Sequence, residues 1–192
     1  LVVACGISSF VAMRGSFASI AYARSRFYEL QRFADVFASL ERAPDEVRAR
    51  IEALPGVARA ESRIVKPMMV PLEGMPEPLR GAAVSLPGLH GGDEAGTLNR
   101  LHLRDGRRPD SDHADEAVLL QAFAEAHHLR AGDHLPVVLN GKLRRLLIVG
   151  IATSPEYIMA IAAGAMSPDP ERFPVVWMGH EALAAAFQLS GA

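Results

Sequence analysis

The sequence is poor in cysteine and in excess charge, and each shortage excludes a class of protein. Its 192 residues include one cysteine, Cys5, so no internal disulfide framework can form. Lys and Arg number 20 against 22 Asp and Glu, which leaves no basic surface for a nucleic acid. No CxxC or HxxxH pair and no GxSxG motif occurs. The usual signatures of zinc sites and serine hydrolases are therefore missing.

The histidines are the first candidates for chemistry. His127 and His128 are adjacent, so on a helix their side chains point about 100° apart and do not easily share one ion. Other possible ligands near them in sequence are Asp110, Asp112, His113, Asp133 and His134. A zinc site needs three or four converging ligands, and we interpret these residues as solvated surface groups. We predict no metal site and no cofactor site.

Nucleophilic catalysis has no better candidate. Cys5 lies in an apolar stretch without a neighbouring base, and Ser154 precedes Pro155 as a turn-opening serine does. The glycine-rich residues 88–92 do not have the spacing of a phosphate-binding loop. The acidic residues Glu73, Glu77, Asp93 and Glu94 are typical of solvated loops. We predict no catalytic residue and conclude that the chain is not an enzyme.

The first 32 residues predict an apolar stub and a helix. Residues 1–13 carry no charge, but they are fewer than the about 20 that a membrane span needs. They fit the outer end of a transmembrane helix, which we favour, the core of a signal peptide or a buried helix, and Cys5 also ends a stretch that is similar to a lipoprotein cleavage site. Residues 14–32 predict a stalk helix leaving the membrane; the alternative is an amphipathic surface helix.

Residues 33–65 predict a strand–helix–strand unit. Residues 33–40 have the composition of a strand, Pro44 opens a helix that ends before Pro55, and residues 57–65 alternate between apolar and polar. Residues 66–98 then become rich in Pro and Gly. We predict a small inserted lobe there, with strands at 68–72 and 82–86 and a mobile loop at 88–96.

Residues 99–192 predict a second strand–helix–strand unit. Residues 116–121 have the length of a strand and residues 122–128 the composition of a helix. Two apolar runs flank Asn140-Gly141, which is the strongest short signal for a β-hairpin. Residues 158–166 form an uncharged run, either a buried loop or an exposed contact patch. A strand at 173–178 and a helix at 180–188 follow.

The ordered set of these features resembles the extracytoplasmic domain of FtsX/MacB-like ABC-transporter permeases. The resemblance covers the second half of the chain well and the first half mainly by layout. The pieces that carry it are Gly106-Arg107-Arg108-Pro109, the strand at 116–121, the helix at 122–126, Leu129-Arg130-Ala131-Gly132-Asp133, Asn140-Gly141, Val149-Gly150-Ile151, residues 154–158 and residues 173–178.

The resemblance implies an α+β fold in which two βαβ-type units form one mixed sheet, with residues 33–65 and 99–192 as the core and 66–98 as the inserted lobe. It also implies a non-catalytic domain on the periplasmic side of the inner membrane, joined to it by flanking transmembrane helices. An ATPase subunit, a second permease subunit and a periplasmic protein are the implied partners, and the cargo is lipoprotein, lipid or other hydrophobic material. The alternative is a soluble or lipid-anchored binding protein whose ligand site lies between residues 88–96 and 158–166.

Overall fold

The protein is described from a computed structural model, which covers residues 2–40, 45–86, 97–157, 169 and 171–189. It is an α+β fold with one mixed sheet of seven strands. The helices of the described residues are α1 (Val2–Leu30), α2 (Asp45–Glu52), α3 (Gln121–Ala126) and α4 (His180–Phe187). The strands are β1 (Val65–Val70), β2 (Leu79–Ser85), β3 (His102–Gly106), β4 (Glu116–Leu120), β5 (His134–Leu139), β6 (Lys142–Thr153) and β7 (Val175–Met178).

The sheet curls until its two ends meet, because β6 is long enough to pair on both of its edges. The strand order is β3-β6-β4-β7-β2-β1-β5, and β5 also pairs with β6. The first half of β6 forms an antiparallel hairpin with β5, and the second half lies parallel to β4. β3 pairs with the end of β6. The six strands other than β3 therefore form a closed ring of pairings.

Both faces of the curled sheet are apolar, as β4 illustrates. Ala117 and Leu119 belong to the larger hydrophobic core, whereas Val118 and Leu120 belong to a second cluster on the other face. Successive side chains of a strand point to opposite faces, so a strand whose residues are all apolar must be covered by other apolar groups on both faces. Helices α3 and α4 contribute buried residues to the larger core, and Trp177 lies in the second cluster.

The hairpin predicted at Asn140-Gly141 is confirmed. Both residues have positive φ values, 48° and 74°, as a type I′ turn requires. The strand predicted at 116–121, the helix at 122–128, the strand at 173–178 and the helix at 180–188 correspond to β4, α3, β7 and α4. The second half of the chain thus has the elements that the sequence predicts, with β3 as an addition.

The first predicted strand–helix–strand unit is wrong in its strands. Residues 33–40 form no strand, and of residues 57–65 only Val65 belongs to one. In this segment, side-chain oxygens accept hydrogen bonds from backbone N–H groups that a neighbouring strand would otherwise accept. The Ala60 N–H donates to Glu52 Oε1, and the Ile64 N–H donates to Ser85 Oγ. The alternation of apolar and polar residues at 57–65 therefore did not indicate a strand: the segment reaches the sheet only at its end, where Ile64 bonds to Ser85 of β2.

The inserted lobe predicted for residues 66–98 is also corrected. β1 and β2 are regular strands of the main sheet, and β2 lies parallel to β7. One of the glycines that suggested irregular structure has a packing role. A Cβ on Gly81 would lie 2.1 Å from the Pro174 carbonyl oxygen, so glycine lets β2 approach the chain that enters β7. The predicted loop at 88–96 lies outside the described residues.

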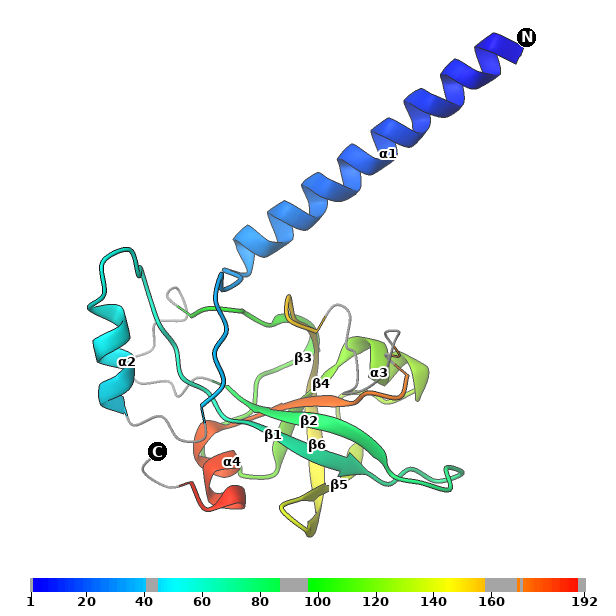
Figure 1. Cartoon of the computed structure of the whole chain (residues 1–192). Helices are drawn as coiled ribbons and strands as arrows, with labels where there is room; N and C mark the ends of the chain where they lie inside the picture. The colour runs from blue at the N-terminus through cyan, green and yellow to red at the C-terminus, as the bar shows by residue number, and fades with distance from the viewer. Residues whose placement is uncertain (1, 41–44, 87–96, 158–168, 170, 190–192) are drawn as a thin grey trace.

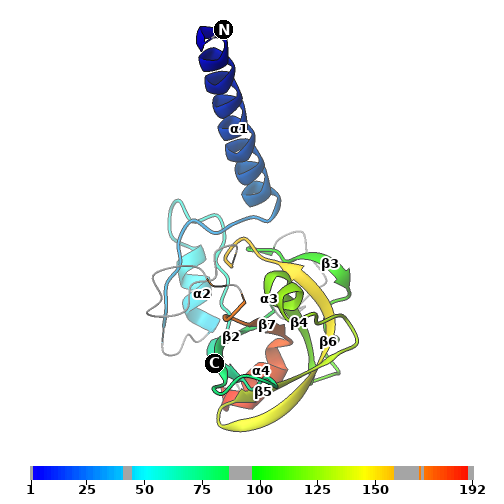
Figure 2. The same ribbon diagram turned by 90° about the vertical axis from the view of Figure 1, so that its right-hand side faces the viewer.

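Helix α1 stands away from the rest of the chain (Figures 1 and 2). It joins the predicted stub and stalk into one continuous helix of 29 residues. No helix among the described residues combines the length and hydropathy of a membrane span. Large apolar side chains of α1 are exposed along its length, at Val3, Ile7, Phe10, Val11, Met13, Phe17, Ile20, Tyr22 and Leu30.

Candidate functional site

The residues that the sequence offered for chemistry do not gather into one site. Within residues 2–40, 45–86, 97–157, 169 and 171–189, no three His, Cys, Asp or Glu side chains are placed to share a metal ion. Cys5 is exposed on α1. His127 Nε2 lies 2.6 Å from the Glu171 carbonyl oxygen, and its ring packs on Phe123. Ser154 is buried, and its Oγ accepts the Glu156 N–H at 3.3 Å.

The Gly-Arg-x-Pro sequence and the Glu at the start of β4 meet in an ion pair, which we call the clasp (Arg107 and Glu116). Arg107 Nη1 donates to Glu116 Oε2 at 2.7 Å, and Arg107 Nη2 donates to Oε1. The Asp110 N–H donates to the same carboxylate at 2.9 Å. The Glu116 side chain is only 8% exposed, whereas that of Arg107 is 56% exposed. The hydrogen bonds from Arg107 hold the pKa of Glu116 below its ordinary value, against the opposing effect of burial.

Two glycines fix the backbone beside the clasp. The Arg107 N–H donates to the Val149 carbonyl oxygen at 2.8 Å, and Gly106 is paired with Gly150 in the β3–β6 register. A Cβ on Gly150 would lie 2.3 Å from the Arg107 carbonyl oxygen, and one on Gly106 would lie 2.2 Å from that of Val149. Three pieces of the resemblance, Gly-Arg-x-Pro, the acidic residue and Val-Gly-Ile, therefore form one contact whose role is structural.

The lower end of α1 is attached to the body of the protein by a second set of contacts, which we call the foot (residues 28–37 with Asn99 and Arg100). The helix ends in a Schellman motif, because the Phe33 N–H donates to the Tyr28 carbonyl and Arg32 has a φ of 48°. The rings of Tyr28 and Phe33 stack with centroids 4.8 Å apart. This is the apolar contact that usually accompanies the motif.

Asn99 connects the foot to the segment that leads into β3. Its N–H donates to the Arg32 carbonyl at 2.9 Å, and its Oδ1 accepts the Ala34 N–H at 2.9 Å. The Arg100 N–H donates to the Gln31 carbonyl at 2.8 Å. These bonds satisfy carbonyl groups that the end of a helix leaves open. The helix is thereby fixed to the body through its backbone.

A further contact of the foot runs to the end of β6. The Arg63 guanidinium lies over the Phe37 ring, 5.7 Å from its centroid, and forms a two-pronged ion pair with Glu156. The Glu156 side chain is 9% exposed. Beside it, Tyr157 packs edge-on against Trp177, and burial raises the pKa of its phenol. The chain that follows α1 thus contacts the segment before β3 directly, and it is linked to the segment after β6 through Arg63.

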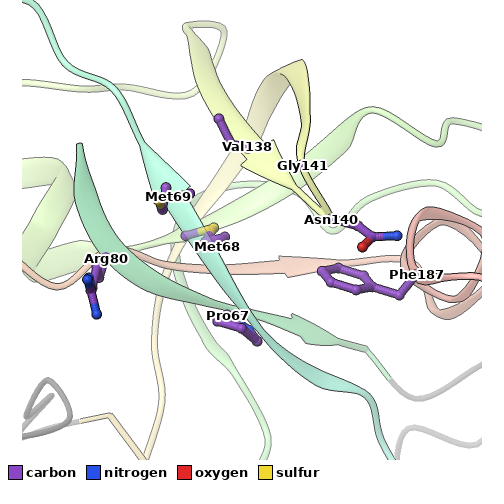
Figure 3. A pocket seen from close by; sticks show the side chains of 8 residues that line it. All are labelled: Pro67, Met68, Met69, Arg80, Val138, Asn140, Gly141 and Phe187. Carbon is purple, nitrogen blue, oxygen red and sulfur yellow. The ribbon is translucent and has the colours of Figure 1, made fainter. Parts of the chain in front are cut away.

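A slot opens in the sheet where β1 and β5 face each other. The two strands pair at one position, Met69 with Val138, although every other neighbouring pair of the ring has a longer register. A cavity of about 390 Å³ lies at this junction. Its lining residues are Pro67, Met68, Met69, Arg80, Val138, Asn140, Gly141 and Phe187 (Figure 3).

Proline explains why the ladder stops. The Ile64 N–H and carbonyl both bond to Ser85 of β2, so the backbone groups of alternate residues, including Pro67, face the β5 side. Pro67 has no N–H to offer there. On the other strand, Asn140 turns away and its Nδ2 donates to the Ala186 carbonyl of α4 at 3.2 Å. The gap between the strands is therefore built by specific residues.

Sequence reasoning missed the slot and the foot. The available signal for the slot was Pro67, since proline inside an apolar run indicates the edge of a ladder. Nothing in the sequence links Asn99 to the end of α1, because that contact spans 65 residues. The two segments of the predicted ligand site in the alternative interpretation, residues 88–96 and 158–166, both lie outside the described residues.

Comparison with known proteins gives a structural likeness only. No family model matches the chain, and no curated protein matches it. Six solved chains match, among them the extracellular domain of the noncanonic ABC-type transporter YknZ from Gram-positive bacteria. That match has 15% identity and a TM-score of 0.43, and covers 76% of this chain and 67% of the other.

Proposed function

We propose that the chain is a non-catalytic extracytoplasmic domain of an ABC-transporter permease subunit, held at the membrane by α1. The observation that carries the proposal is that α1 exposes large apolar side chains along its length and that the chain at its end is hydrogen-bonded to the body. Phe10 and Phe17 are 61% and 75% exposed, and Ile20 is 69% exposed. A monomeric soluble protein rarely leaves so extended an apolar surface in water.

The distribution of charge along α1 supports a division of roles within the helix. From Val3 to Met13 the helix has no charged side chain, and charge begins at Arg14. We assign the uncharged part to lipid contact and the part that follows to a stalk outside the membrane. The stalk still carries Phe17, Ile20 and Tyr22 as exposed side chains, which suit contact with another helix of the transporter.

The foot supports a mechanical role for the domain. A helix moves a domain as a rigid body only if its end does not swivel, and the bonds from Asn99 and Arg100 oppose such swivelling. In this proposal a separate ATPase subunit works in the cytoplasm, and α1 transmits the motion to the domain. The cargo is lipoprotein, lipid or other hydrophobic material, as the sequence resemblance implies.

Cysteine accessibility in cells tests the proposal. In the full-length protein, any cysteine outside this chain is replaced. Cys5 is then compared with a Cys5→Ser, Ser111→Cys variant, in which the cysteine lies in the exposed turn between the two residues of the clasp. A membrane-impermeant maleimide is applied to spheroplasts or intact Gram-positive cells. We expect labelling at position 111 at once, and labelling at Cys5 only after detergent is added.

Two results contradict the proposal. Labelling at position 111 only after lysis would place the domain in the cytoplasm. Rapid labelling of Cys5 without detergent would show that this part of α1 is outside the bilayer.

A further inference from the structure

We propose that the slot between β1 and β5 binds a single-chain amphiphile, with its alkyl chain inside the slot and its terminal carboxylate on Arg80. This inference does not rest on the proposed function, because it follows from the slot alone. A cavity of about 390 Å³ is within the range of small-ligand pockets, which is roughly 300–1,000 Å³.

The slot is a permanent feature of this sequence. Pro67 cannot extend the β1–β5 ladder, and Asn140 is held by α4, so the strands do not close over the opening by pairing further. Met68, 2% exposed, lies on the core side, and Met69, 45% exposed, lies on the outer side. An outward-facing and a core-facing methionine therefore both contribute to the lining.

The lining excludes ligands with many polar groups. Five of the lining residues are apolar: Pro67, Met68, Met69, Val138 and Phe187. The Asn140 amide already donates to α4, which leaves its oxygen and the Arg80 guanidinium as the polar side-chain groups. A sugar or nucleotide would lose many hydrogen bonds to water in such a slot and would find few side-chain groups to replace them. An alkyl chain loses none, and methionine side chains adapt to its shape.

Arg80 supplies the charge for one end of the ligand. It is opposite Met69 in the β1–β2 register and is exposed. Its side chain makes no ion pair or hydrogen bond within the described part of the chain, and no acidic residue lines the slot. In Figure 3, Arg80 lies at one side of the slot, and Asn140 and Phe187 lie at the other. A guanidinium binds a carboxylate with two parallel hydrogen bonds, which fixes the ligand's orientation.

Methionine methyl NMR tests the inference with the slot's own residues. The full chain carries ¹³C-labelled methionine methyl groups and is titrated with dodecanoate below its micelle concentration. Met68 and Met69 report on the slot, whereas Met75 is partly exposed elsewhere, at 36%. We expect saturable shifts at Met68 and Met69 and none at Met75; Met13 is not used as a control, because it lies in the part of α1 assigned to lipid contact.

Two comparisons then test whether the carboxylate of the ligand binds Arg80. Dodecyltrimethylammonium has the same chain with the opposite charge, and we expect it to bind more weakly than dodecanoate. Arg80→Gln should weaken dodecanoate binding about tenfold, since a charge-assisted contact of this kind is worth roughly one decade in affinity. Arg145→Gln is the matched control, because it removes the same charge from an exposed strand position outside the slot lining.

The inference fails if dodecanoate does not shift Met68 and Met69, or if Met75 shifts together with them, which would indicate non-specific partitioning. It also fails if the cationic amphiphile binds equally well or if Arg80→Gln and Arg145→Gln have the same effect. None of these results bears on the membrane topology that tests the proposed function.

Discussion

Two junctions of the curled sheet join distant parts of the chain, and they are built in opposite ways. At the junction of β3, β4 and β6, a buried carboxylate, a guanidinium and two close-packed glycines fix every strand. At the junction of β1 and β5, one residue pair connects the strands and a proline stops the ladder. At the first junction, an added Cβ on either glycine would clash with backbone, whereas the second junction has a cavity. Rigidity and binding are thus assigned to different parts of one sheet.

Among the changes made at the two junctions themselves, the largest effect is expected from Gly150→Ala in the tight junction. The added Cβ would lie 2.3 Å from the Arg107 carbonyl oxygen, which is backbone and cannot rotate away. We expect the free energy of unfolding to fall by about 2–3 kcal/mol, as for other overpacked sites. Urea denaturation measures it. Gly179→Ala is the control, because no atom lies within 4 Å of its added Cβ; an equal loss there would contradict the packing argument.

The clasp should make stability dependent on pH. The pKa of Glu116 is lowered in the folded state by Arg107, so the carboxylate's stabilising contribution is complete above its unfolded pKa of about 4.3. It is lost as the pH falls through the lower, folded value. We expect Glu116→Gln to cost about 1.5 kcal/mol at neutral pH, the size of a hydrogen bond to a charged group.

Urea midpoints measured across the acid range check this prediction. The difference between wild type and Glu116→Gln should shrink as the pH falls below about 4. A difference that stays constant over that range would show that the Glu116 charge has no part in it.

Asn99→Gly should weaken the attachment of α1 to the body and have a smaller effect on stability. Glycine accepts the positive φ of this position, 48°, but lacks the Oδ1 that binds the Ala34 N–H. We expect a loss of about 1 kcal/mol for the hydrogen bond and faster amide exchange at Ala34. Hydrogen exchange measures the latter. Unchanged amide exchange at Ala34 would show that Asn99 does not contribute to the attachment of α1.

The smallest effect is expected at the open junction. Met69→Ala removes a side chain that is 45% exposed, so we expect a change in unfolding free energy of below about 1 kcal/mol. Met178→Ala removes the same groups from a fully buried position and should cost about 2–5 kcal/mol. Thermal or urea unfolding of the two variants compares them. Equal losses would mean that the slot is packed as tightly as the core.

The sequence predicted the fold best where local chemistry decides the structure. Asn140-Gly141 demands one kind of turn, and the apolar run at 116–120 had to be a covered strand. Prediction from the sequence failed where one local pattern is compatible with two different structures. Val36 and Phe37 have the composition of a strand, yet Phe37 packs on Arg63 and no strand lies alongside. β1 and β2 were assigned to a separate lobe because prolines and glycines mark breaks, and only their pairing with β7 and β5 reveals that they are central.

The candidate site could not be predicted for the same reason. Pro67 and Asn140 face each other only because the sheet curls. The two residues are 73 positions apart, and no local sequence pattern indicates that they meet. The clasp could be predicted in part. Its pieces were recognised as an ordered set from the sequence, but their meeting at one point needed the register of β3, β4 and β6.

The double pairing of β6 has a consequence for the order in which the chain folds. The β5–β6 hairpin joins residues close in sequence, and such contacts form first because they close short loops. The completed hairpin then presents an edge on which β4 can align. The β1–β5 junction needs the whole intervening chain in place and gains a single residue pair, so we expect it to close last and to open first.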